Sequence, residues 1–207
     1  MKKFELTSEF VTNIFGVKLF RIRALIAFGS IKVGDKGGFV EKEENLSQYG
    51  DAWVSGNAKV SGNAKVSGNA KVSGDAEVYG NAKVSGNAKV SGDAEVYGDA
   101  EVFGDAWVSG DACVSGNAKV SGNAKVSGNA DYAMVKGFGR NYRNTTFFRC
   151  KDGKIRVVCG CFFGDLDEFR EKVKNTHRDG KMAKEYLAIA DLMEMHFCEE
   201  KDGYGGV

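Results

Sequence analysis

The chain has 207 residues, of which 28 are glycine and none is proline; typical usage would give about half as many glycines and roughly ten prolines. Glycine in excess without proline excludes a collagen helix and a proline-rich tether. Because 29 basic residues balance 28 acidic ones, no net field draws the protein to a membrane surface, and a nucleic-acid partner is not expected. We expect a cytoplasmic protein, since no apolar stretch reaches the roughly 18 residues of a membrane span and the five cysteines form no dense disulfide framework.

Residues 1–49 are predicted to form a β cap. Residues 17–25 read as a strand, and Gly37 with Gly38 predicts a tight turn. Such strands would cover the first edge of the segment that follows, an edge that would otherwise invite further strand pairing.

A six-residue repeat fills residues 50–132. Glycine occurs at every sixth position from Gly50 to Gly128, 14 times in all. Each glycine is followed by Asn or Asp, then Ala, a variable residue, Val and usually Ser. Ala and Val lie two residues apart, so both point to one side of a short strand while the variable residue and Ser point to the other. Glycine with Asn or Asp supplies the corner, because these residues best tolerate positive φ.

This repeat predicts a solenoid. A bend every six residues excludes an ordinary hairpin sheet, and an α-helix would carry an unbroken series of glycines at about 1 kcal/mol each. What remains is a stack of coils joined by parallel pairing. A valine followed four positions later by alanine, as in Val54 and Ala58, resembles the hexapeptide-repeat proteins. That resemblance implies a left-handed parallel β-helix, a triangular prism with 18 residues per coil, and assembly as a homotrimer.

Residues 133–207 are predicted to form a β-hairpin and helices. Strands over residues 146–150 and 154–161 flank Asp152 and Gly153, a strong hairpin signal. Asp165 and Glu168 have the spacing of a capping box, and a second helix is expected over about residues 181–197. The predicted fold class is therefore mainly β: a left-handed parallel β-helix with an N-terminal β cap and a C-terminal hairpin plus helices.

The flanks carry a narrower resemblance. Residues 19–25, 36–41 and 44–47, and the stretch from Cys159 to Gly164, look like the corresponding parts of YdcK-like and phage or prophage hexapeptide proteins. This implies an accessory protein of a mobile element, acting in the host cytoplasm, with interference with a bacterial defence component as its setting. The resemblance does not identify an enzymatic activity.

With 18 residues per coil, departures from the Lys and Ser consensus cluster in a few columns. One cluster is acidic and aromatic, and we predict that it binds a basic protein partner. It comprises Asp75, Glu77, Tyr79, Asp93, Glu95 and Tyr97, with Phe103 interrupting the serines of a neighbouring column. The alternative is that tandem duplication copied one unit and that these aromatic residues pack under the C-terminal domain or against another protomer.

A second column combines aromatic and basic residues: Trp53, Lys71, Lys89 and Trp107. Lysines beside aromatic rings suit a small anionic ligand, including a nucleotide held between protomers. The alternative is a solvated face or a trimer contact.

The number and position of the histidines bear on whether the chain is an enzyme. The hexapeptide acyltransferases use a histidine near a coil corner, and the hexapeptide carbonic anhydrases bind zinc through three, whereas this chain has only His177 and His196, both outside the coils. Cys159 and Cys161 lack the spacing of redox or zinc-ribbon motifs and are interpreted as small apolar residues. We predict no catalytic residue, no metal site and no cofactor.

Three hypotheses follow. The leading one is a non-enzymatic β-solenoid scaffold that binds a protein partner as a homotrimer. The second is a protein that binds or sequesters a small molecule or nucleotide at sites between protomers. The third is a degenerate acyltransferase that recruits His177 or His196 from the helical tail.

Overall fold

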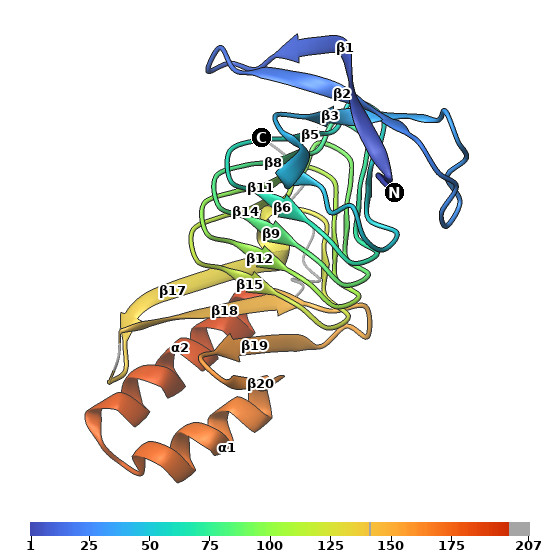
Figure 1. Cartoon of the computed structure of the whole chain (residues 1–207). Coiled ribbons are helices and arrows are strands. Elements are labelled where there is room, and N and C mark those ends of the chain that lie inside the picture. Colours follow the sequence, from blue (N-terminus) through green and yellow to red (C-terminus); the bar gives the residue numbers. More distant parts are fainter. Residues whose placement is uncertain (141, 199–207) are drawn as a thin grey trace, which may run out of the picture.

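A parallel β-solenoid forms the middle of the molecule, with a β cap at one end and a sheet with two helices at the other (Figure 1). The structure is a computed structural model that describes residues 1–140 and 142–198, so residues 199–207 of the predicted C-terminal domain lie outside the described residues. The architecture confirms the predicted fold class, a left-handed parallel β-helix between a β cap and a C-terminal unit of strands and helices.

Each strand of the solenoid has two residues, the variable residue and the valine that follows it. The strands are β4 (Trp53–Val54), β5 (Lys59–Val60), β6 (Lys65–Val66), β7 (Lys71–Val72), β8 (Glu77–Val78), β9 (Lys83–Val84), β10 (Lys89–Val90), β11 (Glu95–Val96), β12 (Glu101–Val102), β13 (Trp107–Val108), β14 (Cys113–Val114), β15 (Lys119–Val120) and β16 (Lys125–Val126).

Three sheets form the walls of the prism. The tryptophan face contains β4, β7, β10, β13 and β16; the tyrosine face contains β5, β8, β11 and β14; the third face contains β6, β9, β12 and β15. Residues 18 apart pair in parallel register, so that Lys71 lies beside both Trp53 and Lys89. The predicted 18-residue coil is therefore confirmed, and with it the sorting of outward side chains into columns.

The repeated Ala and Val side chains fill the interior of the solenoid. From Ala52 to Val126 each of them has an exposed fraction of 1% or less. Burial of each valine contributes about 1.5 kcal/mol or more. The side chains pack in layers because every coil presents the same pattern to the next, which explains how a core without large residues holds together.

The N-terminal cap is a three-stranded antiparallel sheet of β1 (Phe4–Thr12), β2 (Lys18–Ala24) and β3 (Lys36–Val40), followed by a short 3₁₀ helix, η1 (Glu43–Asn45). The last strand, β3, pairs in parallel with β5. The cap therefore continues the tyrosine face and covers its first edge.

The cap also supplies hydrogen-bond donors to the first coil. Within the solenoid, the carbonyl groups of each coil accept N–H groups from the coil before it, as Gly74 does from Asn57. The first coil has no predecessor. Instead, the Lys3 ammonium group donates to Ala52 O (2.9 Å), the Phe39 N–H to Ala58 O (2.9 Å) and the Asn45 amide to Ala64 O (2.8 Å), so the cap supplies donors to every wall.

The C-terminal unit is a four-stranded antiparallel sheet of β17 (Tyr132–Phe138), β18 (Arg143–Arg149), β19 (Ile155–Cys159) and β20 (Phe162–Asp165), reached through the 3₁₀ helix η2 (Asn129–Asp131). The predicted hairpin forms its centre, where β18 pairs with β19. The sequence did not predict β17 and β20. Glycine interrupts the alternation in the first, and the second is short and runs directly into the helix cap.

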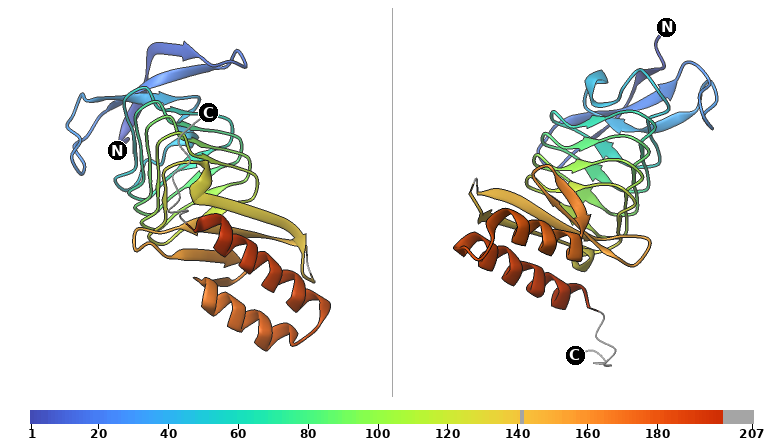
Figure 2. Two further views of the ribbon diagram at one scale, coloured as in Figure 1. Left: turned by 180° about the vertical axis from the view of Figure 1, so that it is seen from behind. Right: turned by 90° about the horizontal axis from the view of Figure 1, so that it is seen from below.

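Helices α1 (Leu166–His177) and α2 (Lys181–Phe197) cover the side of this sheet that faces away from the solenoid (Figure 1, Figure 2). Alternate residues of the sheet divide between two cores: Phe147 packs with the helices, whereas its neighbour Phe148 packs with the solenoid interior. The predicted capping box is present, since Asp165 accepts the Glu168 N–H and Glu168 accepts the Asp165 N–H. Neither helix is long and apolar enough to cross a bilayer, among the residues described.

Candidate binding surfaces

Tyr79 and Tyr97 form a stacked pair at the edge of the tyrosine face. Their rings lie 4.9 Å apart, centre to centre, at an angle of 3°, because register brings equivalent positions of successive coils side by side. The Tyr79 hydroxyl donates to Glu95 Oε2 (2.9 Å). Burial, together with this carboxylate, raises the pKa of Tyr79 above its usual value. Both phenols are therefore neutral at physiological pH, and each ring is half-buried.

The acidic residues of this face are not equivalent. Glu77 forms an ion pair with Lys59 (2.8 Å), and Glu95 accepts the Tyr79 hydroxyl. At the corner leading into the face, Asp75 accepts the Asn57 amide (3.1 Å). The next two carboxylates of that corner, Asp93 and Asp111, have no side-chain partner in the described part of the chain.

The other two corners of the prism show what this corner lacks. At each of them two asparagines precede an aspartate, and each asparagine amide donates to the equivalent side chain of the next coil. At one corner Asn63 donates to Asn81 and Asn81 to Asp99; at the other Asn69 donates to Asn87 and Asn87 to Asp105. The tyrosine-face corner instead places Asp75, Asp93 and Asp111 in succession, without a donor between them. We call Asp75, Asp93 and Asp111 the aspartate column.

The tryptophan face separates its two tryptophans. Trp53 is buried, with an exposed fraction of 3%, and Phe28 packs edge-on against its ring at 5.4 Å. Trp107 is 39% exposed, and its indole N–H donates to Ser91 Oγ (3.1 Å). The first tryptophan therefore fixes the cap to the solenoid, and the second is open to solvent.

A hollow of about 420 Å³ lies between the tryptophan face and the segment of the cap that covers Trp53. We call it the groove. Its lining comprises Phe28, Gly29, Ser30, Ile31, Asp51, Trp53, Ser55, Asn69, Lys71, Asn87 and Lys89. Three of the four residues predicted for this column thus line one cavity, and Trp107 is not among them.

Lys71 and Lys89 are in-register neighbours of like charge. Lys65 and Lys83 on the third face are neighbours in the same way, but Lys83 there forms an ion pair with Glu101 (3.3 Å), which also pairs with Lys119 (3.1 Å). Lys71 and Lys89 are exposed and form no ion pair with the described residues, and the exposed Asp51 lines the groove as well. The lining therefore carries two lysines and one carboxylate.

Phe103 lies away from the tyrosine pair. It follows β12 on the third face, and it is separated from Trp107 by the corner at Gly104. Both aromatic residues are partly exposed, at 37% and 39%. Phe103 therefore lies on a different wall of the prism from Tyr79 and Tyr97, and Trp107 lies on the wall that follows it.

The histidines and cysteines lie mostly outside the coils. The His177 ring packs on Tyr186 (5.9 Å) and the His196 ring on Phe197 (4.8 Å). The five cysteines are free thiols, and burial raises the pKa of Cys150 to about 11. The described residues contain no group of three or more His, Cys, Asp or Glu side chains that could hold a metal ion.

Comparison with protein-family models and with curated protein sequences finds no match. The geometry of these surfaces is therefore the basis for a functional conclusion. The sequence did not predict the segment that covers the groove, because residues 28–31 belong to no repeat, and no pattern sets Phe28 and Ile31 apart from the apolar residues around them.

Proposed function

We propose that the protein is a non-enzymatic binding scaffold whose solenoid presents the tyrosine face to a basic protein partner. The observation that carries this proposal is the aspartate column beside the stacked pair of Tyr79 and Tyr97. Stacked tyrosines offer rigid aromatic surface with little rotamer freedom left to lose, which is the property of a good interface anchor.

The carboxylates of the aspartate column repel one another in the isolated chain. Carboxylates on successive coils are about 4.8 Å apart, where two like charges repel by about 1 kcal/mol even in water. Asparagine at the same position would remove the repulsion and add a donor, as it does at the other corners. A partner with lysine or arginine side chains at its interface would relieve this repulsion.

The setting of this binding follows from the resemblance of the flanks. An accessory protein of a phage or prophage would act on a host protein in the cytoplasm, with a defence component as one candidate. We further propose that the chain assembles as a homotrimer through a prism face. A monomeric mass in solution, measured by light scattering, would exclude the trimer.

Affinity capture with variants tests the tyrosine face. Wild-type protein, a Tyr79→Ala/Glu95→Lys variant and a Lys65→Glu control on the third face are used as baits, and every protein retained by the wild type is purified and titrated directly. We expect one partner whose affinity falls at least tenfold with the double variant and is unchanged with the control. A partner that binds the double variant as tightly as the wild type would refute the proposal.

A second candidate function is binding of a small anionic ligand in the groove. The observation that favours it is that Lys71 and Lys89, adjacent and without an ion pair among the described residues, line a hollow whose volume is in the range of ligand sites. Such a ligand would be held by two ammonium groups, with the indole of Trp53 as an apolar wall.

Thermal-shift measurements with nucleotides and acyl-CoA test this candidate. A ligand of the groove raises the melting temperature with its concentration, and the rise should become smaller in a Lys71→Ala/Lys89→Ala variant but stay unchanged in a Lys65→Ala control. No rise for any of these ligands, or a rise that the double substitution leaves unchanged, would exclude it. The degenerate acyltransferase remains the weakest alternative, because neither histidine lies at a coil corner.

A further inference from the structure

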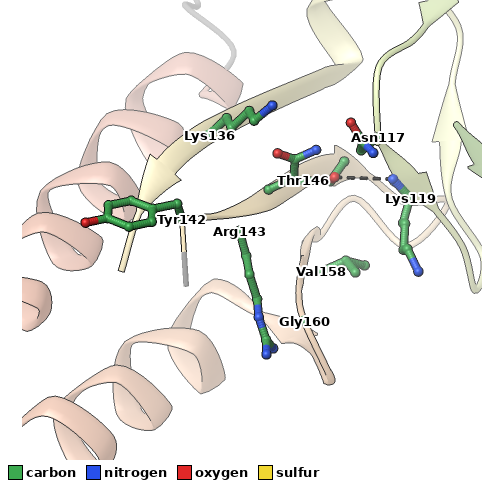
Figure 3. Close-up of a pocket in the computed structure, with 9 residues that line it drawn as sticks. Asn117, Lys119, Lys136, Tyr142, Arg143, Thr146, Val158 and Gly160 are labelled. Carbon is green, nitrogen blue, oxygen red and sulfur yellow. Dashed lines mark hydrogen bonds between the residues drawn. The ribbon is translucent and has the colours of Figure 1, made fainter. Parts of the chain in front are cut away.

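A second basic hollow lies where the solenoid meets the C-terminal sheet, at the opposite end of the prism from the groove (Figure 3). Its volume is about 340 Å³. The lining comes from three parts of the chain: Asn117 and Lys119 from the last coils, Lys136 from β17, and Arg143, Thr146, Val158 and Gly160 from or beside the β18–β19 hairpin, with Tyr142 and Asn144 at the rim. We call it the junction pocket.

The lining carries three cations and no carboxylate. Figure 3 shows Lys136 extending from β17 toward the solenoid, and Arg143 extending from β18 toward the turn at Gly160. Lys119 has one acidic neighbour, Glu101 at 3.1 Å, which it shares with Lys83. In a chain whose charges balance almost completely, three cations around one hollow indicate a local site for negative charge.

Arg143 has no counter-charge among the described residues. Of the seven other arginines, five pair with carboxylates, namely Arg21, Arg23, Arg149, Arg156 and Arg170, whereas Arg140 and Arg178 form no ion pair with the described residues. Arg143 and Lys136 have no ion pair with any residue that the structure describes. The turn is shaped around this arginine: Gly160 has φ +63°, and a Cβ there would lie 2.4 Å from Arg143 Nη1. Glycine at this position lets the guanidinium group lie directly against the backbone at the edge of the pocket.

The floor of the pocket contains a buried hydroxyl group with a proton to donate. Thr146 is 1% exposed, and its Oγ1 accepts the Lys119 N–H (3.3 Å), as the dashed line in Figure 3 marks. Within the described residues, no hydrogen bond is found in which the Thr146 hydroxyl donates its own proton. A buried donor of this kind is normally satisfied, and an oxygen of a bound anion would satisfy it.

From these observations we propose that the junction pocket binds a phosphate-bearing small molecule. The Arg143 guanidinium group offers the planar donor fork that matches two phosphate oxygens, Lys136 and Lys119 contribute charge, and the Thr146 hydroxyl donates from the floor. The hollow is larger than a phosphate group, so it has room for the body of a phosphate ester as well as for free phosphate. This site is independent of the tyrosine face and of the groove.

Calorimetric titration of the full chain at low ionic strength tests the proposal. The probes are inorganic phosphate, adenosine monophosphate and adenosine. We expect saturable binding of at least one phosphate-bearing probe and none of adenosine. Tighter binding of adenosine monophosphate than of phosphate identifies an ester as the ligand, and the reverse order identifies free phosphate.

Variants locate the site. Arg143→Ala and Lys136→Ala should each lower the affinity for the bound probe about tenfold or more, since hydrogen bonds to charged groups are the strong ones. The affinity of Arg143→Lys should lie between those of the wild type and Arg143→Ala. Lys184→Ala on α2 should bind as the wild type does. Lys136 is exposed, so its substitution keeps the test valid if Arg143→Ala does not fold. No saturable phosphate binding, or binding that Lys136→Ala leaves unchanged, would overturn the proposal.

Discussion

Gly92 illustrates what a coil corner demands of its residue. Its φ of +72° lies in the left-handed region, and a Cβ placed there would lie 3.0 Å from both the nitrogen and the oxygen of Gly110 in the next coil. The first condition could be met by asparagine at moderate strain, but the second excludes every side chain. The regularity of the glycines is therefore a consequence of stacking, which is why the sequence alone predicted the six-residue unit, whereas the 18-residue coil was implied by the resemblance to hexapeptide-repeat proteins.

Alanine substitutions separate these two demands. Gly116 has nearly the same φ, +64°, but its Cβ would meet only the flexible end of Met134 at 3.2 Å. We expect Gly116→Ala to lower the free energy of unfolding by about 1 kcal/mol and Gly92→Ala by about 2–3 kcal/mol, because only the latter forces two backbones apart. Urea denaturation measures both, and equal losses would contradict the steric explanation.

Lys3 makes the stability of the first coil depend on pH. Burial lowers the pKa of its ammonium group to about 8, against the opposing charge of Asp51. In the unfolded chain the amine keeps its proton up to a pH of about 10.4. Between these values the unfolded chain binds more protons, so the free energy of unfolding contributed by Lys3 rises with pH across that window.

Comparison with Lys3→Met isolates this effect, because the titration of Cys150 is common to both proteins and cancels. We expect the difference in unfolding free energy to move in favour of the wild type between pH 7.5 and pH 9.5, measured by urea denaturation. A difference that stays constant or moves in favour of Lys3→Met would show that burial does not lower the pKa of the Lys3 ammonium group.

At the scale of the elements, one whole hexapeptide can take the place of another, but half a hexapeptide cannot. Six residues complete one wall and one corner, and Ala and Val return to the inside after every unit. The repeat therefore predicted the solenoid strands and their partners. It said nothing of β17 and β20, because their positions depend on contacts with the end of the solenoid and with α1 rather than on a local pattern.

Two deletions test this interchangeability. Removal of residues 81–86 joins Gly80 to Asn87 and keeps every remaining Ala and Val inside, so we expect a cooperative thermal transition at a modestly lower melting temperature. Removal of residues 81–83 brings Gly80 next to a strand valine and breaks the alternation, which should abolish the transition. Circular dichroism follows both, and equal stability of the two deletions would contradict the six-residue unit.

At the scale of the whole molecule, the regular solenoid separates the N-terminal cap from the C-terminal unit of sheet and helices. The candidate surfaces differ in how far the sequence could predict them. The stacking of Tyr79 with Tyr97 followed from the coil length alone and is confirmed by the ring geometry. The burial of Trp53 and the junction pocket could not be predicted, because each joins segments distant in sequence: Phe28 with Trp53, and Arg143 with Lys119.

The central claim is that Tyr79 and Tyr97 act as one stacked anchor on the tyrosine face. The variant Tyr97→Ser/Ser85→Tyr moves one tyrosine to the third face and leaves composition and charge unchanged, so it tests position alone. We predict that the affinity of this variant for the captured partner, measured by titration, falls at least tenfold while the melting temperature stays close to that of the wild type. An affinity equal to that of the wild type would contradict the claim.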